Sequence, residues 1–381
     1  RVFGKDGRLR ATPPAGVPAR PYDRLAGRTT AAARSTVVDL LRASGDLVGE
    51  PWPITHPVKF FERGDRPLEI VTTRQWYIRN GGRDPALRAD LLAAGRALRW
   101  HPAQMRVRYD HWVSGLTGDW VISRQRFFGV PIPLWYPVDA EGHPRHDAPI
   151  VPAADSLPVD PSSDPPPGYL PEQRGRPGGF VADPDVMDTW ATSSLTPLIA
   201  ATASGPDLRD RVYPMDLRPQ AHEIIRTWLF STVLRAHLDH GSLPWRDVAI
   251  SGWILDPDRR KMAKSKGNVV TPMSLLAEYG SDAVRYWAAC GRPGTDATFD
   301  AGQMRIGRRL AVKILNAGRF VLGLAPTGGT DPATVTEPVD QAMLAALATV
   351  VDDATAAFDG YDYARALELT LETQRTLAAE R

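Results

Sequence analysis

Strand-like and helix-like segments alternate through the middle of this chain of 381 residues, and this alternation restricts the possible folds more than any other feature. Residues 75–116 have helical periodicity, whereas 120–123, 130–136 and 248–254 have the character of short strands. From Asp300 onward the pattern is helical throughout. We therefore expect an α/β domain followed by an all-helical domain.

Capping and turn signals predict several boundaries. Residues 3–9 resemble a hairpin turn. Asp84-Pro85 and Thr271-Pro272 each combine an N-cap residue with proline at the first helical position, which predicts helix starts. Gly241 and Gly280 are expected to end helices.

Four predicted helical regions have a face that we expect to be buried: 29–41, 75–116, 220–240 and the region after residue 300. In chain order the expected buried side chains are Val37, Val38, Leu40 and Leu41; Met105, Tyr109, Trp112 and Leu116; Ile224, Ile225, Trp228, Leu229 and Val233; and Met304, Leu310, Ile314 and Leu315.

Eleven prolines lie between Pro144 and Pro184. Proline removes a backbone donor and blocks helix interiors, so this stretch is expected to be an irregular surface insertion, with bounds near 140–184.

Five cations lie between Arg259 and Lys266, after a predicted strand and a turn, in the order K-M-A-K-S-K-G-N over Lys261–Asn268. A basic loop beside Gly267 suits a flexible clamp for a polyanion such as a triphosphate, because lysines act as mobile point charges. The alternatives are a solvated basic loop or a non-specific nucleic-acid patch.

Three further segments combine polar and aromatic residues: 120–126, 184–194 and 222–228. Each has an ordinary explanation when taken alone. They resemble an edge strand with exposed arginines, a helix start with a half-buried Trp190, and a core helix with one charged neighbour.

Together, and in this order before the lysine loop, these segments resemble the valyl branch of the class I aminoacyl-tRNA synthetases. The lysine loop resembles the "KMSKS" loop of that class (261–265), with Ala263 in place of the first serine. The segments D-V-M-D-T-W-A-T-S-S and R-P-Q-A-H-E-I-I-R-T-W match the valyl pattern over 185–194 and 218–228. An isoleucyl or leucyl synthetase is the nearest rival, and the residues Asp188-Thr189-Trp190 and His222–Ile225 argue against both.

The resemblance implies roles for individual residues. Lys264 would be the main stabiliser of the ATP phosphates, with Lys261 and Lys266 beside it as catalytic lysines of the loop. Gly252 and Trp253 would abut the adenine. The remaining implied site residues are Glu223 at the ribose, and Trp190 and Ile224 as apolar walls of the amino-acid pocket.

The resemblance also implies a division of the chain. Residues 1–74 would be the last part of an inserted editing domain, 75–299 the second half of a Rossmann-type catalytic domain with a parallel sheet, and 300–381 the start of a helical anticodon-binding domain. No H-x-G-H motif occurs, and both ends resemble cuts through a larger protein, so the first Rossmann half is expected upstream and the chain alone is expected to be inactive.

The implied reaction joins valine to tRNA(Val) through valyl-adenylate, using ATP with Mg²⁺ as a substrate complex and no tightly bound metal. A non-catalytic tRNA-binding module is the alternative from another class, and the basic helix after residue 300 favours it. The complete enzyme is expected to be a monomer.

Composition agrees with a cytoplasmic protein. The single Cys290 fits a reducing compartment, and no apolar run approaches the length needed to span a membrane. The 46 basic and 44 acidic side chains nearly cancel, so any nucleic-acid binding must come from local patches.

Overall fold

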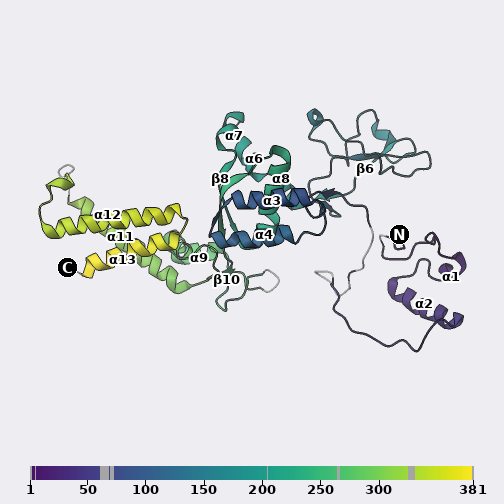
Figure 1. The fold of residues 1–381 in the computed structure, drawn as a ribbon, viewed down its shortest axis with the longest axis horizontal. Coiled ribbons are helices and arrows are strands. Elements are labelled where there is room, and N and C mark those ends of the chain that lie inside the picture. Colours follow the sequence, from purple (N-terminus) through teal and green to yellow (C-terminus); the bar gives the residue numbers. More distant parts are fainter. Residues whose placement is uncertain are drawn as a thin grey trace. The chain divides into compact units, whose positions relative to one another are not determined.

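The structure is a computed structural model, and it describes residues 2–4, 6–60, 68, 73–203, 205–263, 267–324 and 331–379 (Figure 1). The chain divides into two compact units, Arg1–Trp76 and Tyr77–Arg381.

The first unit is small and has a core of Leu9, Tyr22 and Ala33. An antiparallel bridge between Phe3 and Leu9 closes the predicted turn. Helix α1 covers Ala19–Asp23, and α2 covers Thr30–Ser44 with Thr29 as its N-cap.

The predicted buried face of α2 was wrong. The helix buries Ala33 and Thr36, whereas Val37 and Leu41 are exposed and Val38 and Leu40 are half-buried. The reason is that the small core contacts only the first half of the helix.

The second unit is built on a parallel sheet of three strands in the order β2-β9-β8. Strand β2 covers Arg99–His101, β8 covers Met215–Ala221 and β9 covers Trp245–Ser251. The parallel pairing confirms the predicted α/β class. Strand β9 was expected to continue to residue 254, but it ends at Ser251, and a separate strand β10 (Ile254–Leu255) pairs in parallel with β11 (Ala297–Thr298).

Helices α3 (Pro85–Ala97), α4 (Arg106–Ser114) and α8 (Phe230–His240) pack against this sheet and share one core with it (Figure 1). Asp84 caps α3 by accepting from the backbone N–H groups of Ala86 and Leu87, each at 3.1 Å, as predicted. Trp112 was expected in the core of α4, but Val113 takes that position. Val113 is fully buried, whereas the side chain of Trp112 is 36% exposed. Val113 follows the buried Tyr109 by four residues and therefore lies on the same face.

The segment predicted as a helix over 220–240 has a more complex structure. Gln220 and Ala221 end strand β8, a 3₁₀ turn covers His222–Ile224, one π-helical turn covers Ile225–Leu229, and α8 follows. The side chains of Ile225, Leu229 and Val233 are buried, as predicted. Ile224 and Trp228 are only half-buried. Gly241 ends α8 in the left-handed conformation, with φ of 60°.

Short antiparallel pairs of strands flank the sheet. Strand β1 (Tyr77–Ile78) pairs with β3 (Trp120–Val121), β4 (Ser123–Arg124) with β7 (Val186–Met187), and β5 (Trp135–Pro137) with β6 (Phe180–Ala182).

The strands predicted over 120–123 and 130–136 are therefore shorter than expected, because the first is divided between β3 and β4 and the second is reduced to β5. The proline-rich segment between β5 and β6 is irregular, as predicted, with 3₁₀ turns at Ala154–Ser156 and Pro171–Gln173. Helices α5 (Thr189–Ser193), α6 (Thr196–Thr202) and α7 (Pro206–Val212) follow β7.

The C-terminal part is helical, as predicted. Helix α9 covers Pro272–Tyr279, α10 covers Ser281–Ala289, α11 covers Ala301–Gly323, a 3₁₀ turn covers Pro332–Thr334, α12 covers Pro338–Asp359 and α13 covers Tyr363–Ala379. Thr271 occupies the N-cap position of α9, although its side chain makes no capping hydrogen bond there.

The predicted inner face of α11 was correct only near its start. Met304 is fully buried, whereas Ile314 is 56% and Leu315 is 53% exposed. Only the first turns of α11 are closely packed, where Gly307 lies against Tyr286 of α10. Within the described part of the chain, no helix is both long and apolar enough to cross a membrane.

Candidate active site

The carboxyl ends of β8 and β9 bring together three of the predicted site residues. Ala221 and Ser251 are register partners on neighbouring parallel strands, so the segments that follow them leave the sheet at the same edge. The segment after β8 carries Glu223, and the segment after β9 carries Gly252 and Trp253. Ligands of open α/β sheets bind at this kind of edge.

Glu223, Trp253 and Lys261 form a hydrogen-bonded cluster. Oε2 of Glu223 accepts from Nζ of Lys261 at 2.6 Å and from Nε1 of Trp253 at 2.9 Å. The ammonium of Lys261 also lies 4.3 Å from the centre of the Trp253 ring, within the range of a cation–π contact. The hydrogen bond from Lys261 lowers the pKa of Glu223 below its ordinary value, and the bond from Trp253 adds to this effect.

Gly252 is required by a close backbone approach. A Cβ atom at this position would lie 2.1 Å from the carbonyl oxygen of Thr295. The next residue, Trp253, donates its backbone N–H to Oδ1 of Asp296 at 2.8 Å. Any side chain at residue 252 would therefore displace the segment that positions Trp253.

The lysine loop is held at its base by Asn268, which the sequence analysis did not single out. Its Oδ1 accepts from the backbone N–H of Ala263 at 2.9 Å, and its Nδ2 donates to Oδ2 of Asp256 at 2.8 Å. Asp256 also accepts from the backbone N–H of Arg260 at 2.7 Å. Lys264 and Lys266 lie outside the described residues.

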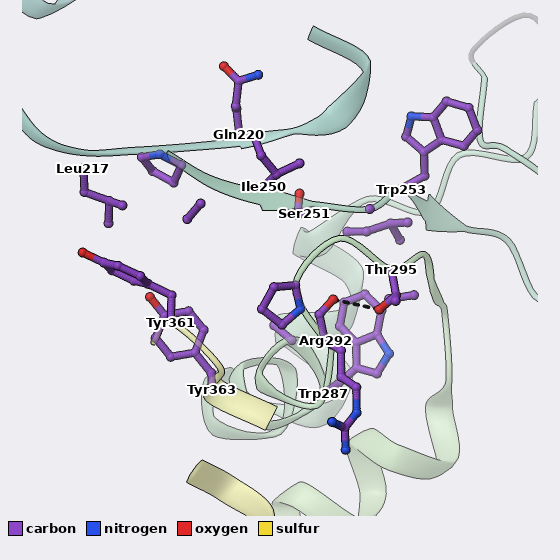
Figure 2. A pocket seen from close by; sticks show the side chains of 18 residues that line it. Leu217, Gln220, Ile250, Ser251, Trp253, Trp287, Arg292, Thr295, Tyr361 and Tyr363 are labelled. Atoms are coloured by element: carbon purple, nitrogen blue, oxygen red, sulfur yellow. Dashed lines mark hydrogen bonds between the residues drawn. The ribbon is translucent and has the colours of Figure 1, made fainter. Parts of the chain in front are cut away.

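A pocket of about 320 Å³ opens beside this edge, and we call it the strand-end pocket (Figure 2). Its lining comes from β8 and β9, from the end of α10 and the segment after it, and from the start of α13 with the residues just before it. The labelled residues are Leu217, Gln220, Ile250, Ser251, Trp253, Trp287, Arg292, Thr295, Tyr361 and Tyr363. Its many aromatic and aliphatic walls with few polar groups are typical of a small-molecule site.

A second pocket, of about 710 Å³, contains Trp190, and we call it the Trp190 pocket. Asp188 caps α5 by accepting from the backbone N–H of Trp190 at 2.9 Å, and it forms an ion pair with Arg124. Arg226 and Thr227 also line this pocket. Ile224 lines neither of the two pockets described, so a shared wall formed by Trp190 and Ile224 stays a prediction.

Arg218 is a second residue that the sequence analysis missed. Its side chain is buried on β8 near the ring of Trp245, at 5.1 Å, and donates from Nε to Oε1 of Gln220 at 3.2 Å. Burial lowers the pKa of Arg218 from its ordinary value to about 9. Its Nη2 atom has no hydrogen-bond partner among the described residues. The signal in the sequence was the alternation of polar residues in R-P-Q, which places Arg218 and Gln220 on one face of β8.

A buried carboxylate also ties the sheet together. Asp247 on β9 is buried and binds His101 of the neighbouring strand, with 2.9 Å between Oδ1 and Nε2, and it pairs with Arg99. The residues that the structure describes hold no group of three or more His, Cys, Asp or Glu side chains suited to a metal ion.

A parallel sheet with a charged aromatic cluster at its carboxyl edge is an arrangement with which α/β enzymes bind ligands. Solved structures agree with this fold. An Agrobacterium radiobacter K84 LeuRS in a ternary complex with tRNA and LeuAMS has a TM-score of 0.57 at 21% identity, covering 69% of this chain and 37% of that one. A Mycobacterium tuberculosis methionyl-tRNA synthetase bound by methionyl-adenylate has a TM-score of 0.52 at 23% identity, covering 76% and 49%.

The family described as tRNA synthetases class I (I, L, M and V) matches residues 32–300, and the chain belongs to this family. The chain is similar to the valine–tRNA ligase of Thermobifida fusca, with 64% identity over 97% of this chain and 43% of the relative. It is also similar to the valine–tRNA ligase of Salinispora arenicola, with 64% identity over 97% of this chain and 44% of that relative. The chain thus spans less than half the length of these relatives.

Proposed function

We propose that this chain is part of a valine–tRNA ligase. The enzyme activates valine with ATP, forming valyl-adenylate and diphosphate, and then transfers valine to the terminal ribose of tRNA(Val). The observation that carries the proposal is the cluster of Glu223, Trp253 and Lys261 at the entrance to the lysine loop. The valine–tRNA ligases to which the chain is similar support the choice of amino acid.

In this proposal each member of the cluster has a separate task. Glu223 is a carboxylate at neutral pH, and the hydrogen bond from Lys261 lowers its pKa further, so it accepts hydrogen bonds from the ribose hydroxyls of ATP. Trp253 supplies an aromatic surface beside the adenine. Lys261 is held by Glu223 before ATP arrives, and the phosphates then compete for its ammonium.

The loop lysines act on the charge that develops during adenylate formation. Lys264 and Lys266 follow Lys261 on the loop, and we propose that they stabilise the departing diphosphate together with the Mg²⁺ that enters as part of the ATP complex. Asn268 fixes the base of the loop, so the lysines approach the phosphates from a defined direction.

Valine would lie between Trp190 and Ile224. An aromatic face and a β-branched side chain fit an isopropyl group and exclude a larger side chain by volume. Both residues are half-buried, and α5 positions Trp190 through the Asp188 cap.

We extend the proposal to the whole chain. Residues 1–74 would belong to an editing domain, 75–299 to the catalytic domain and 300–381 to an anticodon-binding domain. The complete enzyme would be a cytoplasmic monomer.

The test is ATP–diphosphate exchange by an enzyme of the relatives' full length that carries these residues, measured with each amino acid in turn. Valine should support exchange at a kcat/KM above those of isoleucine and leucine. A preference for isoleucine or leucine would contradict the proposal, and so would the absence of exchange with all amino acids.

A second candidate is a non-catalytic tRNA-binding module. It is favoured by the exposed basic face of α11, which carries Arg305, Arg308, Arg309, Lys313 and Arg319. Such a module would bind tRNA with an affinity indifferent to ATP and valine, whereas the ligase would bind a valyl-adenylate analogue at its strand edge.

A further inference from the structure

Two phenylalanines stand out from the surface in the loop after β4. The side chains of Phe127 and Phe128 are 92% and 86% exposed. Their rings lie 4.9 Å apart at an angle of 88°, so the edge of one ring meets the face of the other. This arrangement leaves further ring faces open to solvent. Adjacent exposed aromatic rings are unusual on a free surface and mark a site of interaction.

The base of this loop is fixed by hydrogen bonds to the strand that precedes Trp190. Gln125 donates from Nε2 to Oδ2 of Asp185 at 2.9 Å, and Met187 donates its backbone N–H to Val130 at 2.7 Å. Gly129 adopts φ of 157°, and a Cβ atom there would lie 2.7 Å from the side chain of Val186. Both ends of the loop that carries the rings are therefore anchored, which reduces the entropy that the backbone loses on binding.

Arg124 connects the loop to the Trp190 pocket. Arg124 directly precedes the loop, forms an ion pair with Asp188 and lines that pocket with Trp190. The aromatic pair thus has a set position beside the pocket in which the amino acid would be activated.

Charge indicates the kind of partner. Arg126 lies between Gln125 and Phe127, is exposed, and forms no ion pair within the described ranges. Exposed aromatic rings beside a free cation suit single-stranded nucleic acid, because bases stack on the rings while the cation contacts phosphates.

We propose that Phe127 and Phe128 stack on unpaired bases at the single-stranded 3′ end of a tRNA as that end approaches the Trp190 pocket. This inference rests on the proposed function, which requires the 3′ end to reach the activated amino acid. A docking surface for another protein would also use exposed aromatic rings, but Arg126 and the adjoining pocket favour RNA.

The experiment uses an enzyme of the relatives' full length that carries these residues and two RNA hairpins, one ending in single-stranded ACCA and one blunt. 2-Aminopurine near the 3′ end reports stacking by its fluorescence, and anisotropy gives Kd. The Phe127→Ala/Phe128→Ala variant should weaken binding of the ACCA hairpin about tenfold or more and abolish the stacking signal. Binding of the blunt hairpin should be unchanged.

Two variants serve as controls. Phe127→Trp/Phe128→Trp should retain the affinity and the stacking signal, because tryptophan also presents an aromatic face. Leu170→Ala removes another exposed apolar side chain, in the proline-rich segment, and should change neither. Circular dichroism should match for all variants, since the two rings are exposed.

An alanine variant that binds each hairpin with the same affinity as the parent chain would overturn the proposal. So would a failure of the parent chain to distinguish the hairpins, or an alanine variant that loses only self-association, which would assign the rings to a protein contact. The RNA assay needs neither ATP nor valine. Failure of amino-acid activation with intact stacking would therefore count against the proposed function alone.

Discussion

The proposed nucleotide side and the proposed amino-acid side of the candidate site are assembled to different degrees. Glu223, Trp253 and Lys261 come from three separate segments, yet they contact one another through hydrogen bonds and a ring contact. Trp190 and Ile224 are each half-buried, and Ile224 does not line the Trp190 pocket. Polar partners therefore fix the proposed nucleotide side, whereas no such contact joins Trp190 to Ile224 among the hydrogen bonds and pockets of the described residues.

The largest expected effect concerns a lysine of the loop. In the full-length enzyme, Lys264→Ala should lower the rate of valine activation about 10²-fold or more, because it removes a charge-assisted contact to a transferring phosphate. Valine binding without ATP should change little. Lys313→Ala, which removes an exposed lysine on α11, is the control. A near-normal rate of valine-dependent diphosphate exchange in the Lys264 variant would remove this lysine from the nucleotide side.

The amino-acid side is tested by Ile224→Ala. Enlarging the pocket should raise the ratio of isoleucine to valine activation about 10- to 100-fold, since one methylene in a hydrophobic pocket contributes about 1–3 kcal/mol, a range for which synthetases of this family are a standard example. The ratio of kcat/KM values from exchange kinetics measures this effect. Ile225→Val, a change at a fully buried core position, should leave the ratio unaltered. If the ratio stays fixed in the Ile224 variant as well, Ile224 belongs to the core and the comparison between the two sides fails.

A smaller effect is expected from Asn268→Ala. The variant loses hydrogen bonds to Ala263 and Asp256, each of which contributes about 1 kcal/mol. The KM for ATP should rise several-fold to tenfold, while the KM for valine remains the same and the melting temperature changes little. Equal rises in both KM values would show that Asn268 stabilises the whole site and not the loop alone.

The smallest effect concerns pH. The pKa of Glu223 is lowered in the folded chain, so its contacts with Lys261 and Trp253 are fully present above the ordinary pKa of glutamate and are lost only as pH falls through the lowered value. The indole N–H signal of Trp253, assigned with Trp253→Phe, should be constant at neutral pH and shift only in acid below the ordinary range of glutamate. Glu223→Gln should abolish this titration, whereas Glu172→Gln should not. A shift of the signal at the ordinary pKa of glutamate would mean that the cluster does not form in solution.

The sequence predicted the elements that local signals specify. The Asp84 cap, the ends at Gly241 and Gly280 and the irregular proline-rich segment depend on neighbouring residues, and all were confirmed. Burial of α2 and α11 was predicted less well, because an amphipathic pattern does not show how far the partner surface extends. Ile314 and Leu315 have core spacing but lie beyond the part of α11 that is closely packed.

The candidate site shows the same division between features that the sequence predicts and features that depend on contacts in the fold. The resemblance to the synthetases identified Glu223, Trp253 and Lys261, and the structure brings them together. It did not identify Asn268 or Arg218, since Asn268 acts through Asp256 and Arg218 lies near the ring of Trp245 on the neighbouring strand, and neither contact is visible in the sequence. The turn from β8 into a 3₁₀ and then a π-helical segment was also hidden, because its hydrophobic spacing is the same as that of a regular helix.

The central claim is that the strand edge binds the nucleotide and the Trp190 region binds valine. A crystal structure of the full-length enzyme with a non-hydrolysable valyl-adenylate analogue tests it most directly. We expect the Glu223 carboxylate within hydrogen-bond distance of the ribose hydroxyls, Trp253 beside the adenine, and the isopropyl group between Trp190 and Ile224. An adenosine group bound away from Glu223 and Trp253, or an isopropyl group that contacts neither Trp190 nor Ile224, would contradict the account.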